Sequence, residues 1–110
     1  KVTQINTYHV QQFAGWIEKL KSIKEGDSTL LDNSMIVYGA GLSDGNRHLH
    51  EDLPTLIAGR AGNYFKPGRR IVYRRKQPLC NLFLTMMDRM GVPVDHFGDS
   101  TGRLDGLDLA

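Results

Sequence analysis

The chain of 110 residues has few cysteines, little net charge and no long apolar run. Its single cysteine, Cys80, excludes an internal disulfide framework and a thiolate-rich metal cluster. Fourteen Lys and Arg face twelve Asp and Glu, and the resulting net charge of +2 is too small to indicate a nucleic-acid partner, so we expect none. No apolar run approaches the roughly 20 residues that cross a bilayer, so we also expect no membrane span.

What is present is the composition of a folded domain, with 40% hydrophobic and 24% charged residues. Residues 6–23 predict a helix, and Pro78 suits the first turn of a second helix that Gly91 ends. Each helix has apolar residues at spacings of three and four, which predicts a face that packs against a sheet or another helix. The first stripe comprises Phe13, Trp16, Ile17, Leu20 and Ile23, and the second comprises Leu79, Leu82, Phe83, Met86 and Met90.

Two continuous apolar runs predict strands that are covered on both faces. Residues 34–38 and 53–58 lack the alternation of a half-exposed strand. Residues 69–75 predict a short edge strand. Together with the helices, these runs predict a three-layer α/β fold, with the core elements in residues 1–94 and an irregular tail in residues 95–110.

The long polar loop after the first strand is the candidate site. It reads GAGLSDGNRHLHED, from Gly39 to Asp52. If this segment is extended, His48 and His50 lie on the same side, and imidazole with carboxylate oxygen is a ligand set for Zn²⁺ and similar divalent ions. The hypothesis is a metal site for Zn²⁺ or Ca²⁺ that is held by Asp44, His48, His50 and Asp52. The alternative is a solvated loop whose Asp and Asn side chains stabilise turns.

Other catalytic patterns in the sequence are weaker. Gly39 and Gly41 resemble the start of a dinucleotide fingerprint, but no helical pattern follows them. A nucleophilic serine could be paired with a histidine as Ser43 with His48 or as Ser100 with His96. Neither serine lies in a recognisable nucleophile elbow, so we do not favour these pairs.

A basic cluster around the predicted edge strand gives a second candidate site. Arg69 and Arg70, together with Arg47 of the polar loop, are candidate anion-binding residues. An anionic small molecule or a glycan is the expected ligand class. The alternative is structural, because charged side chains on an edge strand discourage pairing with another chain.

Three stretches of the sequence, which lie between residues 29 and 104, carry a family resemblance. They are TLLDNSMIVYGAGLSDGNRHLHEDLPTLIAG, FKPGRRIVY and PLCNLFLTMMDRMGVPVDHFGDSTGRL. They resemble the C-terminal end of an uncharacterised family of exported bacterial proteins. The resemblance implies a periplasmic or extracellular location and a much longer parent chain. A sequence that starts at Lys1 within a helical pattern, without a signal peptide, agrees with a fragment of such a protein.

At a coarser level, the element order resembles the last part of the alkaline phosphatase and sulfatase superfamily. Residues 53–57 are similar to its late strand, and the turn at residues 66–68 is similar to the turn that follows. Ala40 and Gly41 stand where that superfamily has an acidic metal ligand. The resemblance therefore implies metal-dependent hydrolysis of phosphate or sulfate esters as ancestry only.

Two functions remain as expectations. In the first, the chain is part of an exported hydrolase-like protein, and its His/Asp loop contributes to a metal or anion site completed by other parts. In the second, it is a non-catalytic structural module, or one that binds glycans or cell-envelope components. We expect the chain alone not to be catalytic. Its expected partner is the remainder of the parent chain or a second copy of itself.

Overall fold

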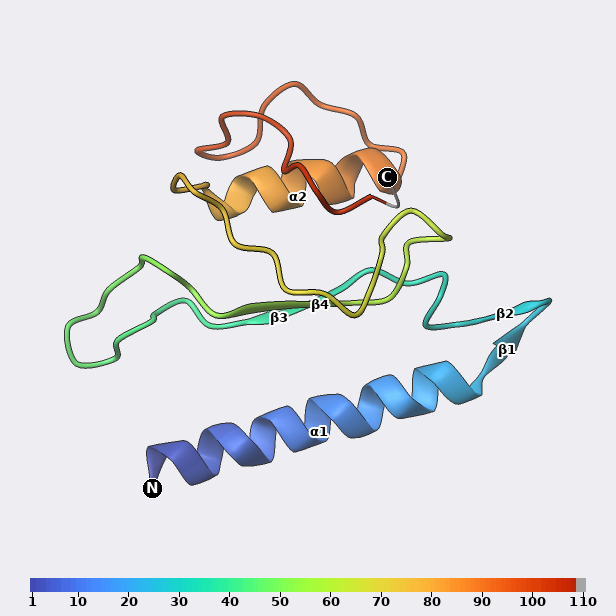
Figure 1. The fold of residues 1–110 in the computed structure, drawn as a ribbon, viewed down its shortest axis with the longest axis horizontal. Coiled ribbons are helices and arrows are strands. Elements are labelled where there is room, and N and C mark those ends of the chain that lie inside the picture. Colours follow the sequence, from blue (N-terminus) through green and yellow to red (C-terminus); the bar gives the residue numbers. More distant parts are fainter. Residues whose placement is uncertain (109–110) are drawn as a thin grey trace. The chain divides into compact units, whose positions relative to one another are not determined.

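The computed structural model describes residues 1–108, so the last two residues of the predicted tail lie outside the described residues. The chain divides into two compact units, Lys1–Arg60 and Ala61–Ala110, here called the N-terminal unit and the C-terminal unit. Within the described part, the chain has two helices and two separate two-stranded antiparallel sheets (Figure 1). The fold is therefore mixed α/β, a coarser result than the three-layer arrangement that the sequence predicts.

The first helix, α1 (Val2–Ser22), begins four residues before the predicted start. Its last turn carries Lys19 and Lys21, whose charges are favourable near the negative end of the helix dipole. The predicted apolar stripe is only partly covered, and none of the residues of α1 is fully buried. Among residues 1–108, neither helix is both long enough and apolar enough to cross a membrane.

A short hairpin follows α1, formed by β1 (Lys24–Glu25) and β2 (Ser28–Thr29). Its turn contains Gly26, which has a positive φ of 58°. The helix itself ends at Ser22, so Gly26 serves the hairpin turn and not the cap of the helix. Backbone hydrogen bonds from Leu30 to Ile23 and from Leu31 to Leu20 join the hairpin to the end of α1.

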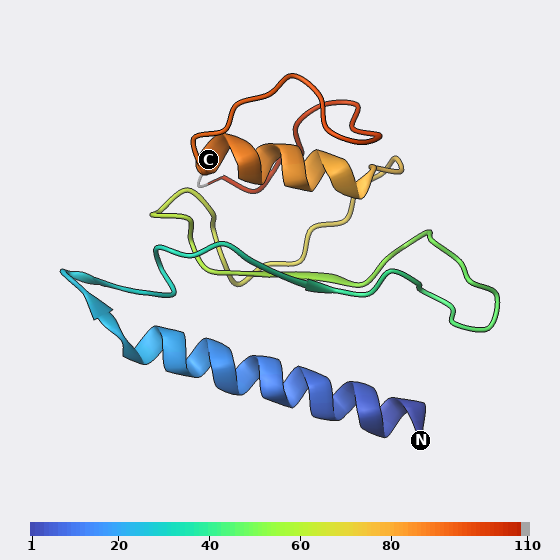
Figure 2. The same ribbon diagram turned by 180° about the vertical axis from the view of Figure 1, so that it is seen from behind.

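The two predicted strands of the N-terminal unit are confirmed as β3 (Ile36–Gly39) and β4 (Thr55–Ala58). They are antiparallel, with Ile36 opposite Ala58 and Gly39 opposite Thr55. The prediction that both faces are covered is wrong for the described chain, because no residue of either strand is fully buried. Both ribbon views show α1 running alongside this hairpin (Figures 1 and 2).

The antiparallel pairing changes the position of the polar loop. The loop of residues 40–54 is the connection of a hairpin, and it lies at the carboxyl end of β3 and the amino end of β4. The rule that ligands gather beyond the carboxyl ends of strands applies to parallel sheets. The pairing of β3 with β4 therefore does not place the loop at such an edge.

The C-terminal unit is built on α2 (Leu79–Arg89), which follows Pro78 as predicted. Gly91 has a positive φ of 74° just after the helix, which confirms it as the stop signal. The predicted stripe is partly wrong, because Met90 is 71% exposed while Leu84, which the stripe omits, is completely buried. The buried face of α2 comprises Asn81, Leu82, Leu84 and Thr85.

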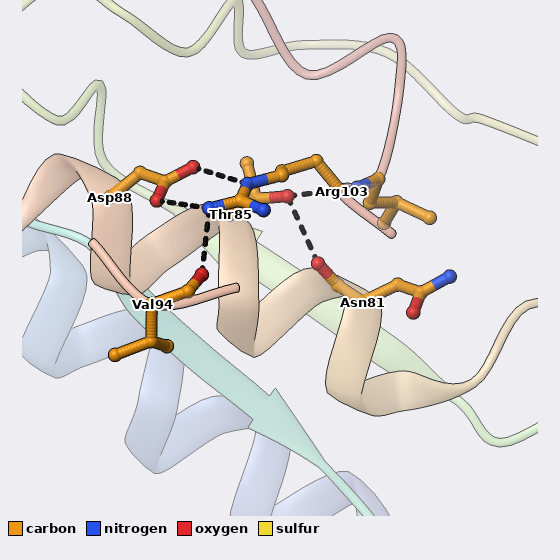
Figure 3. A network of polar contacts seen from close by, with 6 residues as sticks. Asn81, Thr85, Asp88, Val94 and Arg103 are labelled. Carbon is orange, nitrogen blue, oxygen red and sulfur yellow. Dashed lines mark hydrogen bonds and ion pairs between the residues drawn. The ribbon is translucent and has the colours of Figure 1, made fainter. Parts of the chain in front are cut away.

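Polar contacts from the tail explain why two polar residues of α2 are buried. The Oδ1 atom of Asn81 accepts a hydrogen bond from the backbone N–H of Thr101 at 2.8 Å. The hydroxyl of Thr85 accepts one from the backbone N–H of Leu104 at 2.8 Å and donates to the carbonyl of Asn81 at 2.9 Å (Figure 3). Residues 95–108 are thus irregular, as predicted, and residues 101–104 are fastened to α2.

An ion pair adds a further attachment of the tail. The guanidinium of Arg103 binds both carboxylate oxygens of Asp88, at 2.8 and 3.0 Å, and also donates to the carbonyl of Val94 (Figure 3). The hydrogen bond from Arg103 holds the pKa of Asp88 below its usual range. Nearby, Gly98 has a φ of 57°, and a side chain at this position would meet the sulfur of Cys80.

Candidate functional site

The polar loop of residues 40–54 is folded into a smaller hairpin. The backbone N–H of Ser43 donates to the carbonyl of Leu49 at 2.9 Å, and the N–H of Leu49 donates to the carbonyl of Asp44 at 3.2 Å. Residues 45–48 form the turn between these two positions. The loop is therefore locally ordered by its own backbone.

The carboxylate of Asp44 stabilises this turn. Its Oδ1 atom accepts hydrogen bonds from the backbone N–H groups of Asn46, at 2.9 Å, and Arg47, at 3.1 Å. Its Oδ2 atom lies 3.9 Å from the Nε atom of Arg47. Two predicted site residues, a metal ligand and an anion binder, thus contact each other, and Asp44 does what the alternative interpretation of the loop expects of it.

The two histidines occupy different local conformations. His48 has a left-handed backbone with a φ of 54°, so the extended alternation that would align it with His50 is broken. The Nδ1 atom of His50 lies 2.8 Å from the carbonyl oxygen of Gly41. Because a carbonyl only accepts, Nδ1 carries the hydrogen, and Nε2 is the nitrogen that remains for a ligand. Asp52 is exposed and also left-handed, with a φ of 51°.

The four predicted metal ligands do not form a common site in this loop. Among residues 1–108, no group of three or more His, Cys, Asp or Glu side chains is arranged to hold a metal ion. One of the four, His50, has the outer hydrogen bond that commonly orients a histidine ligand.

The serine pairs also lack catalytic geometry. The buried hydroxyl of Ser100 accepts a hydrogen bond from the backbone N–H of Phe97 at 2.9 Å. The hydroxyl of Ser43 donates to the carbonyl of Leu49 at 3.3 Å. Both hydroxyls are thus hydrogen-bonded to the backbone.

The second candidate site is the run from Lys66 to Lys76, here called the basic segment. It holds six of the fourteen Lys and Arg of the chain and no acidic residue. The predicted edge strand is wrong, because residues 69–75 form no strand. All residues of the basic segment are exposed except Tyr73, which is half-buried.

Two side chains attach the basic segment to the tail. Arg69 donates from Nε to the carbonyl of Lys66 at 3.0 Å and from Nη2 to the carbonyl of Asp108 at 2.8 Å. The hydroxyl of Tyr73 donates to the carbonyl of Asp105 at 2.6 Å. These bonds replace the sheet pairing that the prediction assumed. Two of the hydrogen-bond donors of Arg69 therefore hold the segment in place, whereas no such contact is found for Arg70 within residues 1–108.

The anchor at Tyr73 has an electrostatic consequence. Burial and the neighbouring charge of Asp105 raise the pKa of the Tyr73 hydroxyl, and the cation of Arg69 opposes this effect. The hydroxyl therefore keeps its proton, and its hydrogen bond, to a higher pH than a free tyrosine would. The apolar pattern of residues 71–73 predicts a strand and so gives no sign of this role, although a lone aromatic residue among arginines is a usable signal.

The predicted anion-binding residues belong to different units. Arg47 lies in the N-terminal unit, and Arg69 and Arg70 lie in the C-terminal unit. The basic segment is thus a candidate site in its own right. Comparison of the chain with protein-family models, with curated proteins and with solved structures found no match.

Proposed function

We propose that the chain is a non-catalytic binding module that contacts an anionic polymer, such as an acidic glycan of a cell envelope, through the basic segment. The observation that carries the proposal is the concentration of cations. Six positive side chains fall within eleven residues that hold no acidic side chain, and nearly all of these residues are exposed. Such a run raises the local concentration of anions.

The positions of the arginines support this proposal. Within residues 1–108, the structure gives no hydrogen bond or ion pair to the side chains of Arg70, Arg74 and Arg75. Guanidinium groups bind sulfate, carboxylate and phosphate groups with two parallel hydrogen bonds. Three such groups in six residues match a ligand whose negative charges repeat, and they exceed what one small anion needs.

The anchors of the basic segment favour a glycan over a nucleic acid. The hydroxyl of Tyr73 is bound to Asp105, and Tyr73 is the only aromatic residue of the segment. Single-stranded nucleic acids are usually held by aromatic rings that stack on bases, in addition to cations. The segment offers cations without an exposed ring, which fits a polymer recognised by its charge.

Binding to heparin, used as a sulfated glycan probe, tests the proposal. Replacing Arg70, Arg74 and Arg75 together by Gln should weaken binding at least tenfold, and the affinity of the unaltered protein should fall steeply between about 50 and 200 mM salt. The matched control replaces Lys19, Lys21 and Lys24 by Gln in the N-terminal unit and should bind as before. Equal binding by both triple variants would remove the proposal. Equal affinity for single-stranded DNA of matched charge would contradict the choice of a glycan.

A second candidate function is favoured by the bond between His50 and Gly41. We also propose that the polar loop contributes the Nε2 atom of His50 to a Zn²⁺ or Ca²⁺ site in a longer exported parent protein with a three-layer, alkaline-phosphatase-like core. In that protein, metal-dependent hydrolysis of phosphate or sulfate esters is the expected ancestral chemistry. A histidine that donates its other N–H to a backbone carbonyl is held in the tautomer that a metal requires.

The metal content of the parent protein separates the two functions. His50→Ala should lower bound zinc or calcium at least tenfold. His48→Ala is the matched control, because His48 lies in the same loop in a left-handed turn and lacks the orienting bond, and it should have a smaller effect. A metal content that is unchanged by His50→Ala would exclude the second function and leave the first intact.

A further inference from the structure

The exposed surface of α1 is unusual because it lacks charge. Residues 2–17 contain no Lys, Arg, Asp or Glu, although all except Phe13 and Ile17 are exposed. Exposed helices normally carry charged side chains on the face away from the core. Several large apolar side chains are exposed along this part of the helix, namely Val2, Ile5, Tyr8, Val10 and Trp16.

An open groove of about 440 Å³ lies between α1 and β3, within the N-terminal unit. The rings of Phe13 and Tyr38 are stacked with their centroids 4.8 Å apart and a tilt of 25°. Tyr8 and Trp16 line the same groove and are 58% and 50% exposed. Four aromatic residues from two elements therefore line a shallow surface that is open to solvent.

Hydrogen-bonding groups lie beside these rings. Gln12 and His9 complete the lining of the groove. Within residues 1–108, the structure gives no hydrogen bond to the side chains of Gln12, His9 or Tyr8. These groups offer amide, imidazole and phenol donors and acceptors to a ligand. The lining contains no Lys, Arg, Asp or Glu side chain.

We propose that this groove binds an uncharged sugar ring. A pyranose ring has an apolar face of C–H groups that lies against a flat aromatic ring, and it has hydroxyls at its edge that need hydrogen-bonding partners. The aromatic rings supply the first kind of contact, and Gln12, His9 and Tyr8 supply the second. The absence of formally charged side chains from the lining selects against an anionic ligand, which would need a positive partner.

Two features argue against a second copy of the chain as the occupant. A stable interface between proteins involves about 20–30 residues on each side, far more than the exposed apolar residues of α1. Of the exposed apolar residues of α1, Val2, Ile5, Tyr8 and Trp16 share one side of the helix, whereas Val10 does not. At 3.6 residues per turn, Val10 lies roughly opposite Tyr8 on the helix, so one flat partner surface would not cover both.

The groove and the basic segment lie in different units, and this proposal does not depend on the proposed function. The tests also differ. Binding of heparin reports on Arg70, Arg74 and Arg75, whereas the sugar test below uses a neutral probe and a signal from Trp16. Failure of one experiment leaves the other unaffected.

Trp16 is the only tryptophan of the chain, so its fluorescence reports on the groove directly. Titration with cellohexaose, maltohexaose and chitohexaose, each an uncharged oligosaccharide, should give a saturable change in the Trp16 emission with at least one of them. Tyr8→Ala and Gln12→Ala should each weaken this binding at least fivefold. Val10→Ala is the matched control, because it removes an exposed apolar side chain from another side of α1, and it should leave the affinity unchanged.

Two results would overturn the proposal. One is the absence of a saturable change with all three sugars, while circular dichroism confirms that the protein is folded. The other is a change in the Trp16 emission with protein concentration alone, accompanied by a dimer in analytical ultracentrifugation. The second result would assign the face to contact between copies of the chain. Calorimetry of Trp16→Ala, which removes the largest ring, should show at least tenfold weaker binding.

Discussion

At the scale of single residues, Gly59 controls the end of the β3–β4 hairpin. It follows β4 directly, is buried and has a φ of 95°. A side chain at Gly59 would overlap the carbonyl oxygen of Ser34 and approach the carbonyl oxygen of Leu31. Two backbones therefore meet at this position with no room for a Cβ atom. Gly59 is therefore required both because it allows two backbone segments to approach each other closely and because it can adopt a positive φ.

Gly59→Ala should destabilise the protein severely. The left-handed backbone alone costs a residue with a Cβ atom about 1–3 kcal/mol, and the overlap with the backbone near Ser34 adds to that cost. Gly26→Ala is the control, because Gly26 also has a positive φ but has open space around its Cβ position. Chemical denaturation should give Gly59→Ala a clearly lower free energy of unfolding than Gly26→Ala. Equal losses of unfolding free energy would show that the overlap is relieved at little cost.

The hydroxyl of Tyr73 should make the stability of the protein depend on pH. The pKa of its hydroxyl is raised in the folded protein, so the stabilisation is complete below the unfolded value near 10 and is lost as the pH rises through the folded value. Absorbance at 295 nm should show a tyrosine transition above pH 10 that is absent from Tyr73→Phe. The variant should also bind heparin with less dependence on pH between 9 and 11, because its segment lacks the titrating anchor. A transition that persists in Tyr73→Phe would contradict the assignment.

At the scale of elements, the attachment of the tail to α2 rests on a buried amide. Asn81 is 2% exposed and makes three side-chain hydrogen bonds, two with Thr101 and one with Gln77. Its amide thus replaces the apolar contact that a helix stripe usually supplies. The amide is what makes the irregular tail a fixed part of the C-terminal unit.

Asn81→Ala should cost about 1–3 kcal/mol of unfolding free energy, because it leaves the backbone N–H of Thr101 without its partner. Asn33→Ala is the matched control. Asn33 also makes two side-chain hydrogen bonds, to Glu25 and Ser28, but it is exposed, so its loss should cost about 0.5 kcal/mol or less. Urea denaturation of the two variants measures both values. Equal costs would show that burial of the amide is unimportant.

The elements that the sequence predicts well are those with a strong local signal. Pro78 and Gly91 mark the two ends of α2, and the continuous run ending at Tyr38 marks β3. The edge strand at residues 69–75 failed because its apolar centre of Ile71, Val72 and Tyr73 has no partner strand in the described chain. Hydrogen bonds from side chains to distant carbonyls hold that segment in place, and no local pattern encodes them.

The candidate site was predicted less well than the fold. The loop exists and is polar as expected, but the alternation of His48 and His50 assumed an extended backbone. Asp44 accepts hydrogen bonds from the two N–H groups of its own turn, a local interaction that competes with metal binding. The groove on α1 was not predicted, since its rings come from two elements, although the uncharged stretch of residues 2–17 was visible in the sequence.

At the scale of the whole molecule, charge is divided between the two units. Residues 61–110 contain eight Lys and Arg and five Asp and Glu, whereas residues 1–60 contain six and seven. The net charge of +2 conceals this division, which is why the overall composition gave no signal for an anionic partner. A polyanion should therefore distinguish the two halves of the chain.

Addition of heparin at low salt should slow hydrogen exchange or shift amide resonances in residues 66–76 and leave residues 1–60 unchanged. The reason is that the cations of the C-terminal unit are concentrated in one exposed segment. Resonances of the N-terminal unit serve as the internal control. Perturbations of equal size in both units would indicate non-specific attraction and contradict the division of charge.

The packing of Cys80 against Gly98 makes the thiol of Cys80 a probe of movement in the tail. The sulfur lies where a side chain of Gly98 would be, and it is the only thiol in the chain. Cys80 is half-buried, so movement of the turn at Gly98 away from α2 should raise the rate at which a bulky maleimide adds to its sulfur. This rate should be compared between the unaltered protein and Asn81→Ala. A faster addition in the variant would show that the tail moves away from α2 more often when the Asn81 amide is lost.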